Sequence, residues 1–114
     1  IFKPRLMSSI GKPCPYCSHT MEAQGSRHVT RDHILPRIEA RKLKGRLRQQ
    51  VNDVNCIVVC RACNEENGSK MLHEYMLFML KISHSDAMRL SLLIDSLRAN
   101  HPPQVFIALT GSPA

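Results

Sequence analysis

Short β-branched runs predict two strands in the first half of the chain. Residues 55–60 form the clearer one, because three β-branched residues stand in a row there. Residues 27–31 are also β-prone and would place Asp32 and His33 at the end of a strand. Pro36 breaks this run, so the chain must turn soon after the two polar residues.

Helical spacing dominates the second half of the chain. A short helix is expected after residue 63 and should end at Gly68. A second helix is predicted over residues 69–82, with Ser69 as its N-cap, and a third over residues 84–100. Their apolar stripes are best explained as core, and they consist of Leu72, Tyr75, Met76, Met79, Leu90, Leu93, Ile94 and Leu97.

The end of the chain carries weaker signals. Ser83 and Asp86 form a pair resembling a capping box at the start of the third helix. Two consecutive prolines end that helix, and residues 105–107 beyond them predict either a docked strand or a loose end. The whole pattern predicts an α+β protein with one domain overall, in which residues 1–82 form the core and residues 83–114 a C-terminal helix and tail packed on it.

Composition restricts both the core and the partners. The chain is 43% hydrophobic but only 4% aromatic and has no Trp, so a bound metal would help to hold a core of aliphatic residues and Met. The formal charge of +7 favours a polyanionic partner, nucleic acid before membrane. The longest apolar run, residues 75–80, is too short to cross a bilayer, and residues 1–12 lack the apolar stretch of a signal peptide. We therefore expect a cytoplasmic location.

Four of the five cysteines stand in two Cys-x-x-Cys pairs, Cys14 with Cys17 and Cys60 with Cys63. Each such turn presents two sulfurs to one point, so two turns predict a closed tetrahedral site for structural Zn²⁺. The alternatives are a redox pair or two unrelated surface pairs, although a thioredoxin-like site would need a βαβ context that is not predicted here. Cys56 is left over and is expected to be a core thiol.

Asp32, His33 and Asn64 offer a second kind of chemistry. Carboxylate and amide oxygens suit a hard divalent cation, and an imidazole, which titrates near neutrality, suits proton transfer from water. An Asp-His dipeptide is common, and an Asn in this position is more often a helix N-cap. Their placement favours a site, because the second cysteine pair fixes Asn64 and the preceding strand can bring it beside Asp32.

These motifs together resemble the HNH endonucleases, also called ββα-metal nucleases. The resemblance covers roughly residues 12–80 and is carried by Asp-His-Ile-Leu-Pro at 32–36, Cys-Arg-Ala-Cys-Asn at 60–64, Asn55 and Gly68. The subgroup with four cysteines, which includes phage junction-resolving endonucleases, is the most similar, because it also has Asn after the last cysteine.

The resemblance implies a small ββα-metal motif held by a four-cysteine zinc site and followed by two C-terminal helices. It implies that His33 is the general base, that Asn55 fixes the connecting loop, and that Asp32 and Asn64 hold a catalytic cation. The family cleaves DNA with Mg²⁺ or a similar divalent cation and leaves 5′-phosphate and 3′-hydroxyl ends. For this subgroup the resemblance implies a bacterial or phage-infected cell.

The chain departs from the family pattern at two places. A Lys often stands three residues after the position of Asn64, where this chain has Asn67, with Lys70 as a nearby substitute. The Gly-rich loop that commonly follows the proline is replaced by the basic segment 37–48, which is predicted to be an exposed loop or a frayed helix around Gly45.

Basic residues around the motif are the predicted contacts with the DNA phosphate backbone. They are Arg31, Arg37, Arg41, Lys42, Lys44, Arg46, Arg48 and Lys70. A solvated charged loop is the simpler explanation for such a run. A homodimer that uses the apolar helix stripes is an alternative to their role as core. Two rival functions remain: a zinc-knuckle module that binds nucleic acid without cleaving it, and a redox-active thiol protein.

Overall fold

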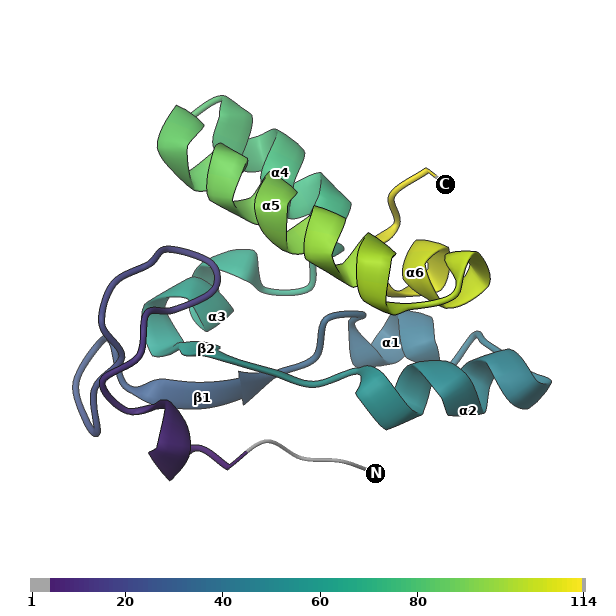
Figure 1. Ribbon diagram of the computed structural model, residues 1–114, viewed down its shortest axis with the longest axis horizontal. Helices are drawn as coiled ribbons and strands as arrows, with labels where there is room; N and C mark the ends of the chain where they lie inside the picture. Colours follow the sequence, from purple (N-terminus) through teal and green to yellow (C-terminus); the bar gives the residue numbers. More distant parts are fainter. Residues whose placement is uncertain (1–4, 114) are drawn as a thin grey trace.

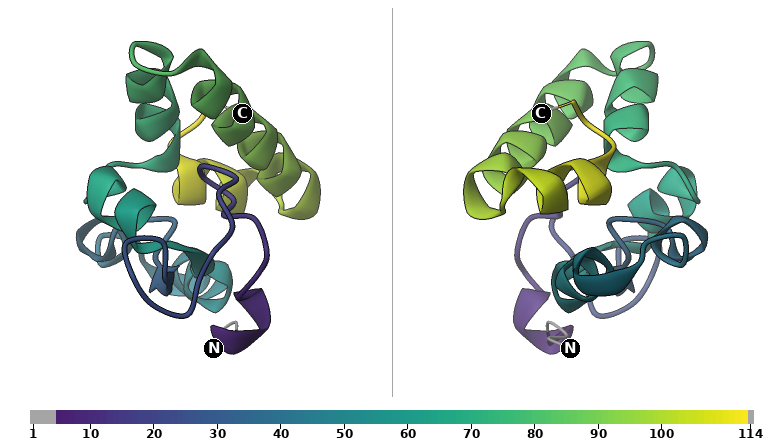
Figure 2. Two further views of the ribbon diagram at one scale, coloured as in Figure 1. Left: turned by 90° about the vertical axis from the view of Figure 1, so that its left-hand side faces the viewer. Right: turned by 90° about the vertical axis from the view of Figure 1, so that its right-hand side faces the viewer.

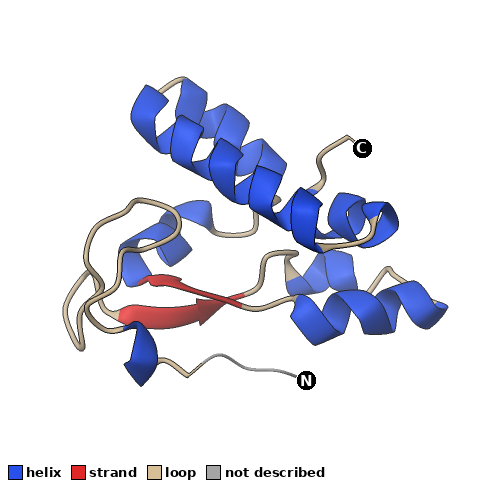
Figure 3. Cartoon of the chain, viewed as in Figure 1, coloured by secondary structure: helices blue, strands red, loops and turns tan. Residues whose placement is uncertain are grey.

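The computed structural model describes residues 5–113 and shows a mixed α+β fold. In this part of the chain a two-stranded antiparallel sheet is accompanied by six α-helices and one short 3-10 helix (Figures 1 and 3). In chain order the elements are η1 (Met7–Ser9), β1 (Val29–Asp32), α1 (Arg37–Ala40), α2 (Gly45–Val54), β2 (Ile57–Cys60), α3 (Arg61–Asn67), α4 (Leu72–Leu80), α5 (His84–Asn100) and α6 (Pro103–Thr110).

Both predicted strands are present and pair with each other. In the antiparallel register Val29 lies opposite Cys60, and Asp32 lies opposite Ile57. Val59 is fully buried, and β2 continues without a loop into α3, which packs against both strands. The sheet therefore holds the end of β1 and the start of α3 in a fixed relation.

The basic segment 37–48 is helical in α1 and in the first part of α2, with residues 41–44 as a short connection, instead of the expected loop or frayed helix. Gly45 has a φ of 62° and begins α2 instead of interrupting a helix. Val51 of α2 is fully buried and Leu47 partly so, and this apolar anchor outweighs the local effect of glycine and charge. Pro36 supplies the N-cap of α1, which is a single turn long.

The helix boundaries in the second half agree only in part with the prediction. Gly68, with a φ of 58°, ends α3 as expected. The expected N-cap at Ser69 is wrong, because α4 begins at Leu72 with Met71 in the N-cap position. At the start of α5 the Ser83 hydroxyl accepts a hydrogen bond from the backbone N–H of Asp86, as the capping pair predicts.

The predicted strand or loose end after residue 102 is a third C-terminal helix, α6. Pro103 occupies its first turn, where proline favours helix formation because the missing N–H is not needed there. Val105, Phe106 and Leu109 are buried, and the helix lies between α2 and the α4–α5 pair (Figures 1 and 2). The described part of the chain therefore has three helices after α3 instead of the expected two.

One hydrophobic cluster connects the cysteine-rich loop with the C-terminal helices. It extends in sequence from Cys14 to Leu109. Tyr16 in the loop and Tyr75 in α4 are both 2% exposed, and their ring centroids lie 5.8 Å apart. Among the described residues, no helix is both long and apolar enough to span a membrane.

The position of α6 can be tested with neighbouring substitutions. Phe106→Ala is expected to lower the free energy of unfolding by about 3–5 kcal/mol, because it leaves a cavity at a fully buried site. Ile107→Ala, in the same helix but 40% exposed, should change it by about 0.5 kcal/mol or less. Chemical denaturation measures both values, and equal effects would contradict a docked helix.

Candidate metal centre and adjoining basic pocket

The four cysteines of the two pairs meet in one buried cluster. Cys14 and Cys17 lie in the loop before β1, while Cys60 ends β2 and Cys63 lies in the first turn of α3. Their Sγ atoms all lie within 4.8 Å of one another, and all four residues are buried. The sequence prediction that these four residues come together is thus confirmed.

The spacing of the sulfurs suits a metal ion. The Sγ atoms of Cys17 and Cys60 are 3.8 Å apart. Four sulfurs about 2.3 Å from a central ion lie about 3.8 Å from one another in a tetrahedron, so the cluster fits a tetrahedral thiophilic ion.

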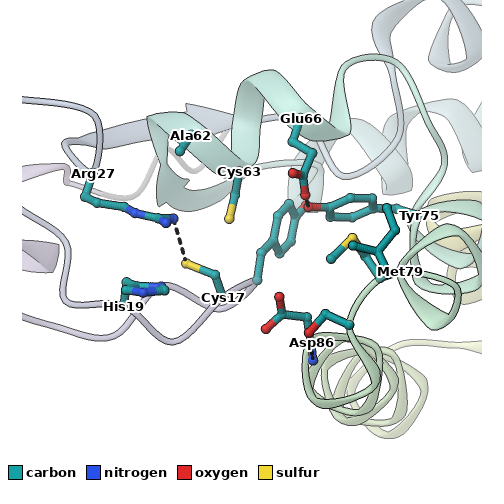
Figure 4. A pocket seen from close by; sticks show the side chains of 12 residues that line it. Cys17, His19, Arg27, Ala62, Cys63, Glu66, Tyr75, Met79 and Asp86 are labelled. Atoms are coloured by element: carbon teal, nitrogen blue, oxygen red, sulfur yellow. Dashed lines mark hydrogen bonds between the residues drawn. The ribbon is translucent and has the colours of Figure 1, made fainter.

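Hydrogen bonds favour a thiolate at Cys14, whereas burial raises the pKa of Cys17 to about 11 and the hydrogen bond with Cys14 raises the pKa of Cys63. The backbone N–H groups of Tyr16 and Cys60 each approach Cys14 Sγ at 3.4 Å. The pKa of Cys14 is lowered to about 4, first by a hydrogen bond with the side chain of Cys63 and then by these backbone donors, although burial opposes the shift. Arg27 donates from Nη1 to Cys17 Sγ at 3.4 Å (Figure 4) and also to Cys60 Sγ at 3.5 Å.

A cavity of about 230 Å³ borders this cluster on the side of α4 and α5. Cys17 and Cys63 line it together with Arg27, Glu66 and Asp86, as Figure 4 shows. Charges of both signs therefore surround it, and it offers no preference for an anion.

Two histidines near the cysteine pairs, His19 and His73, and the fifth cysteine do not belong to the cluster. His19 is exposed, and the ring nitrogen Nδ1 of His73 lies 3.3 Å from the hydroxyl of Ser112. Cys56 is half-buried and lies just before β2. The expectation of a core thiol within the strand is therefore wrong.

Asp32 ends β1 in a half-buried position with several polar neighbours. Its Oδ2 accepts hydrogen bonds from Tyr16 Oη at 3.4 Å and from Asn67 Nδ2 at 3.5 Å. Burial raises the pKa of Asp32, while hydrogen bonds from Asn67, the His33 backbone and Tyr16 lower it. The pKa of Tyr16 is raised well above its usual value, first by burial and then by the charge of Asp32, so its hydroxyl remains a donor at neutral pH.

Asn64 and Asn67 lie on the same face of α3 and meet β1 at successive inward positions. Asn64 Nδ2 donates to Thr30 Oγ1 at 3.1 Å and to the Arg31 carbonyl at 3.4 Å. The residue that contacts the Asp32 carboxylate is Asn67, one helical turn later. Among residues 5–113 the side-chain hydrogen bonds of Asn64 use its nitrogen and leave Oδ1 without a partner. A cation shared by Asn64 and Asp32 stays a prediction.

Asn55 holds the loop that follows His33. Its Oδ1 accepts from the Leu35 N–H at 2.6 Å, and its Nδ2 donates to the Leu35 carbonyl at 2.9 Å. Asn55 is 5% exposed, so these two bonds satisfy backbone groups that water cannot reach. The contact is of the kind expected for this position, and its effect on the His33 side chain stays a prediction.

A basic pocket lies beside His33. It has a volume of about 150 Å³ and is lined by His33, Arg37, Ala40, Arg41, Arg48, Asn52 and Asn55. Arg37 and Arg41 come from α1 and its C-terminal end, and Arg48 from α2, so two short helices place their basic faces around one space. We refer to this space as the basic pocket.

The other predicted DNA contacts are more dispersed. Lys42 forms an ion pair with Glu39 at 3.2 Å, and Lys44 and Arg46 are exposed at the start of α2. Arg31 is exposed on β1. Lys70 lies over the Phe78 ring at 4.8 Å and donates to the Glu66 carbonyl, so the contacts found for it are with α3 and α4.

Sequence reasoning missed two neighbours of Asp32, namely Tyr16 and Asn67. Asn67 stands three residues after Asn64, which is the spacing of one helix face, and this signal could have identified it. Nothing in the sequence joins Tyr16 to Asp32, because the contact depends on the cysteine cluster bringing the loop to β1. Comparisons with models of protein families, with curated proteins and with solved structures find no match for this chain.

Metal binding can be tested by comparing two cysteines in the same segment. The parent should hold about one tightly bound ion per chain, and Cys60→Ser should lose it. A structural zinc ion contributes about 10 kcal/mol or more in small domains, which exceeds the stability of many domains, so this variant is expected to be largely unfolded. Elemental analysis and circular dichroism measure the two effects.

Cys56→Ser provides the matched control, because Cys56 lies outside the cluster. It should keep both the ion and the fold. A parent without metal, or a Cys60→Ser variant that retains it, would overturn the assignment of the cluster as a metal centre.

Proposed function

We propose that the chain is an HNH endonuclease of the ββα-metal class, which hydrolyses phosphodiester bonds in DNA. The observation that carries the proposal is the basic pocket beside His33, at the end of the strand that also bears Asp32. Three arginines around a histidine suit a phosphate group, and a carboxylate next to them suits a cation. In this proposal β1, β2 and α3 form the ββα unit.

His33 acts as the general base in the proposed reaction. It removes a proton from a water molecule, whose oxygen attacks the phosphorus atom. The bond between phosphorus and the 3′ oxygen of the preceding nucleotide breaks, and that oxygen leaves as a hydroxyl after taking up a proton from solvent. The products then carry 5′-phosphate and 3′-hydroxyl ends, as the resemblance implies. Asn55 supports His33 by holding the backbone at Leu35.

Two metals with separate tasks are proposed. Zn²⁺ in the cysteine cluster holds the first loop against β2 and α3, without an open position for substrate. Asp32 and Asn64 Oδ1 would hold Mg²⁺ or a similar cation, which neutralises phosphate charge and stabilises the leaving oxygen when bound. Carboxylate and amide oxygens are the donors that such hard cations prefer.

DNA is the proposed partner, in the cytoplasm of a bacterial or phage-infected cell. Arg37, Arg41 and Arg48 line the basic pocket and would contact the phosphate nearest the reaction. The exposed Lys44 and Arg46 would contact the backbone further along. A homodimer would allow both strands to be cut, and it remains a secondary part of the proposal.

The catalytic assignment predicts a specific loss on substitution of His33. His33→Ala should reduce plasmid nicking in Mg²⁺ by about 10²–10⁴-fold, the usual contribution of a general base, while DNA binding is retained. His84→Ala, which removes an exposed histidine at the start of α5, should nick like the parent. Agarose gels of supercoiled plasmid and a binding assay give the two measurements.

The outcomes separate the candidate functions. A parent that binds DNA but does not nick it with any divalent ion would indicate a binding module and end the nuclease proposal. Nicking that survives in His33→Ala would remove His33 from the mechanism.

The role of the basic pocket can be distinguished from general charge. Arg41→Ala and Arg46→Ala each remove one positive charge from the same segment, but only Arg41 lines the pocket. Both should weaken DNA binding by a similar, salt-dependent factor. Arg41→Ala should in addition lower the nicking rate at saturating DNA by roughly tenfold, as expected for a charge-assisted contact. Identical rates in the two variants would show that the pocket does not hold the reacting phosphate.

A further inference from the structure

Tyr16 connects the cysteine cluster with Asp32. It lies between Cys14 and Cys17 and is 2% exposed, so its orientation is fixed by packing. Its backbone N–H approaches Cys14 Sγ at 3.4 Å, and its hydroxyl donates to Asp32 Oδ2 at 3.4 Å. A single residue therefore contacts a sulfur of the metal centre and the carboxylate at the end of β1.

Asn67 approaches the same carboxylate oxygen from α3. Its Nδ2 lies 3.5 Å from Asp32 Oδ2, and the residue is 2% exposed. Its Oδ1 is buried without a hydrogen-bond partner among the described residues. An amide with a buried, unpaired oxygen is costly, and turning it over would set that oxygen against the carboxylate. Within residues 5–113 the contact with Asp32 is thus the hydrogen bond that the Asn67 side chain makes.

Both contacts are long and individually weak, so their main effect is to orient the Asp32 carboxylate. The two side-chain donors meet at Oδ2, and the backbone N–H of His33 also donates to the carboxylate, so the three donors together fix its plane. The two oxygens of a carboxylate offer about four acceptor sites, so a site remains for an additional ligand. A carboxylate held in this way loses less rotamer freedom when it binds a cation, which strengthens binding without a new contact to the ion.

We infer that Tyr16 and Asn67 are positioning residues that orient Asp32 toward a divalent cation, and that Tyr16 thereby makes cation binding depend on the cysteine cluster. This inference rests on the proposed function, in which Asp32 is a cation ligand. It assigns neither residue to the cation itself. It also gives the first cysteine pair a task beyond holding the fold.

The molecule contains a matched control for Tyr16. Tyr75 is equally buried, its ring lies 5.8 Å from that of Tyr16, and its hydroxyl also donates to a carboxylate, Glu66 Oε1, at 2.7 Å. Tyr16→Phe and Tyr75→Phe each remove one buried hydroxyl that donates to an acid. They differ in whether that acid is Asp32.

The experiment uses protein that carries its structural metal and measures two values. The first is the dissociation constant for Mn²⁺, obtained by electron paramagnetic resonance, and the second is the Mg²⁺ concentration for half-maximal nicking. Tyr16→Phe should raise both values roughly three- to tenfold, the loss expected for one modest hydrogen bond. The nicking rate at saturating Mg²⁺ should stay near that of the parent, since excess cation compensates for a poorly oriented ligand. Tyr75→Phe should leave both values unchanged.

Asn67→Leu supplies a second, independent variant of similar volume. It should shift the Mn²⁺ and Mg²⁺ values in the same direction as Tyr16→Phe, with unchanged content of the structural metal. If both variants titrate like the parent, or if Tyr75→Phe shifts as much as Tyr16→Phe, the inference is overturned.

Failure of the inference can be told apart from failure of the proposed function. A parent that nicks DNA, with variants that titrate identically, leaves the nuclease intact and removes the positioning role. A parent that never nicks ends the proposed function, and the Mn²⁺ arm then decides alone: weaker binding in Tyr16→Phe supports the inference, and equal or absent binding overturns it.

Discussion

Four sulfurs from two distant segments converge on one point, and the rest of the structure depends on this convergence. Cys17 and Cys60 are 43 residues apart in sequence, yet their sulfurs lie 3.8 Å apart. The loop that carries the first pair contains no helix or strand between η1 and β1, and isolated bridges at Pro13–Thr20 and Glu22–His28, together with turn hydrogen bonds, give it its backbone contacts. Bringing four buried sulfurs together is unfavourable if each is charged, and a divalent ion removes that conflict.

Through the sheet and α3, the cysteine cluster also determines which side chains lie next to Asp32. Because β2 runs directly into α3, Cys60 and Cys63 set where the helix begins and which side faces β1. A helix rises about 1.5 Å per residue and a strand about 3.3 Å, so residues one turn apart on α3 meet residues two apart on β1. Asn64 accordingly reaches Thr30, while Asn67 reaches Asp32.

The sequence was most informative where chemistry depends on residue type and spacing. The two cysteine pairs, the strands beside them and the glycine that ends α3 could be predicted because each has a strong local signal. The pairing of Asn64 with Thr30 could not, since it depends on the helix-to-strand register.

Local signals failed where long-range packing decides the structure. Gly45 and its charged neighbours predict little helix, yet α2 forms because Val51 is buried. Ser69 is a good N-cap by itself, but the chain turns again before α4 begins at Leu72. The prolines at 102 and 103 end one helix and also begin another, and the buried side chain of Phe106 is what makes the second helix stable.

The packing of α6 on α2 has a mechanical consequence for the arginines of the basic pocket. A charged segment of this kind would usually be a flexible arm that orders only when it meets its partner. Here α2, which carries Arg48, already packs against α6, so little conformational entropy of its backbone remains to be lost on binding. In the proposed complex the protein would therefore act as a rigid template, and a nucleic acid whose shape does not match it would have to bend to fit.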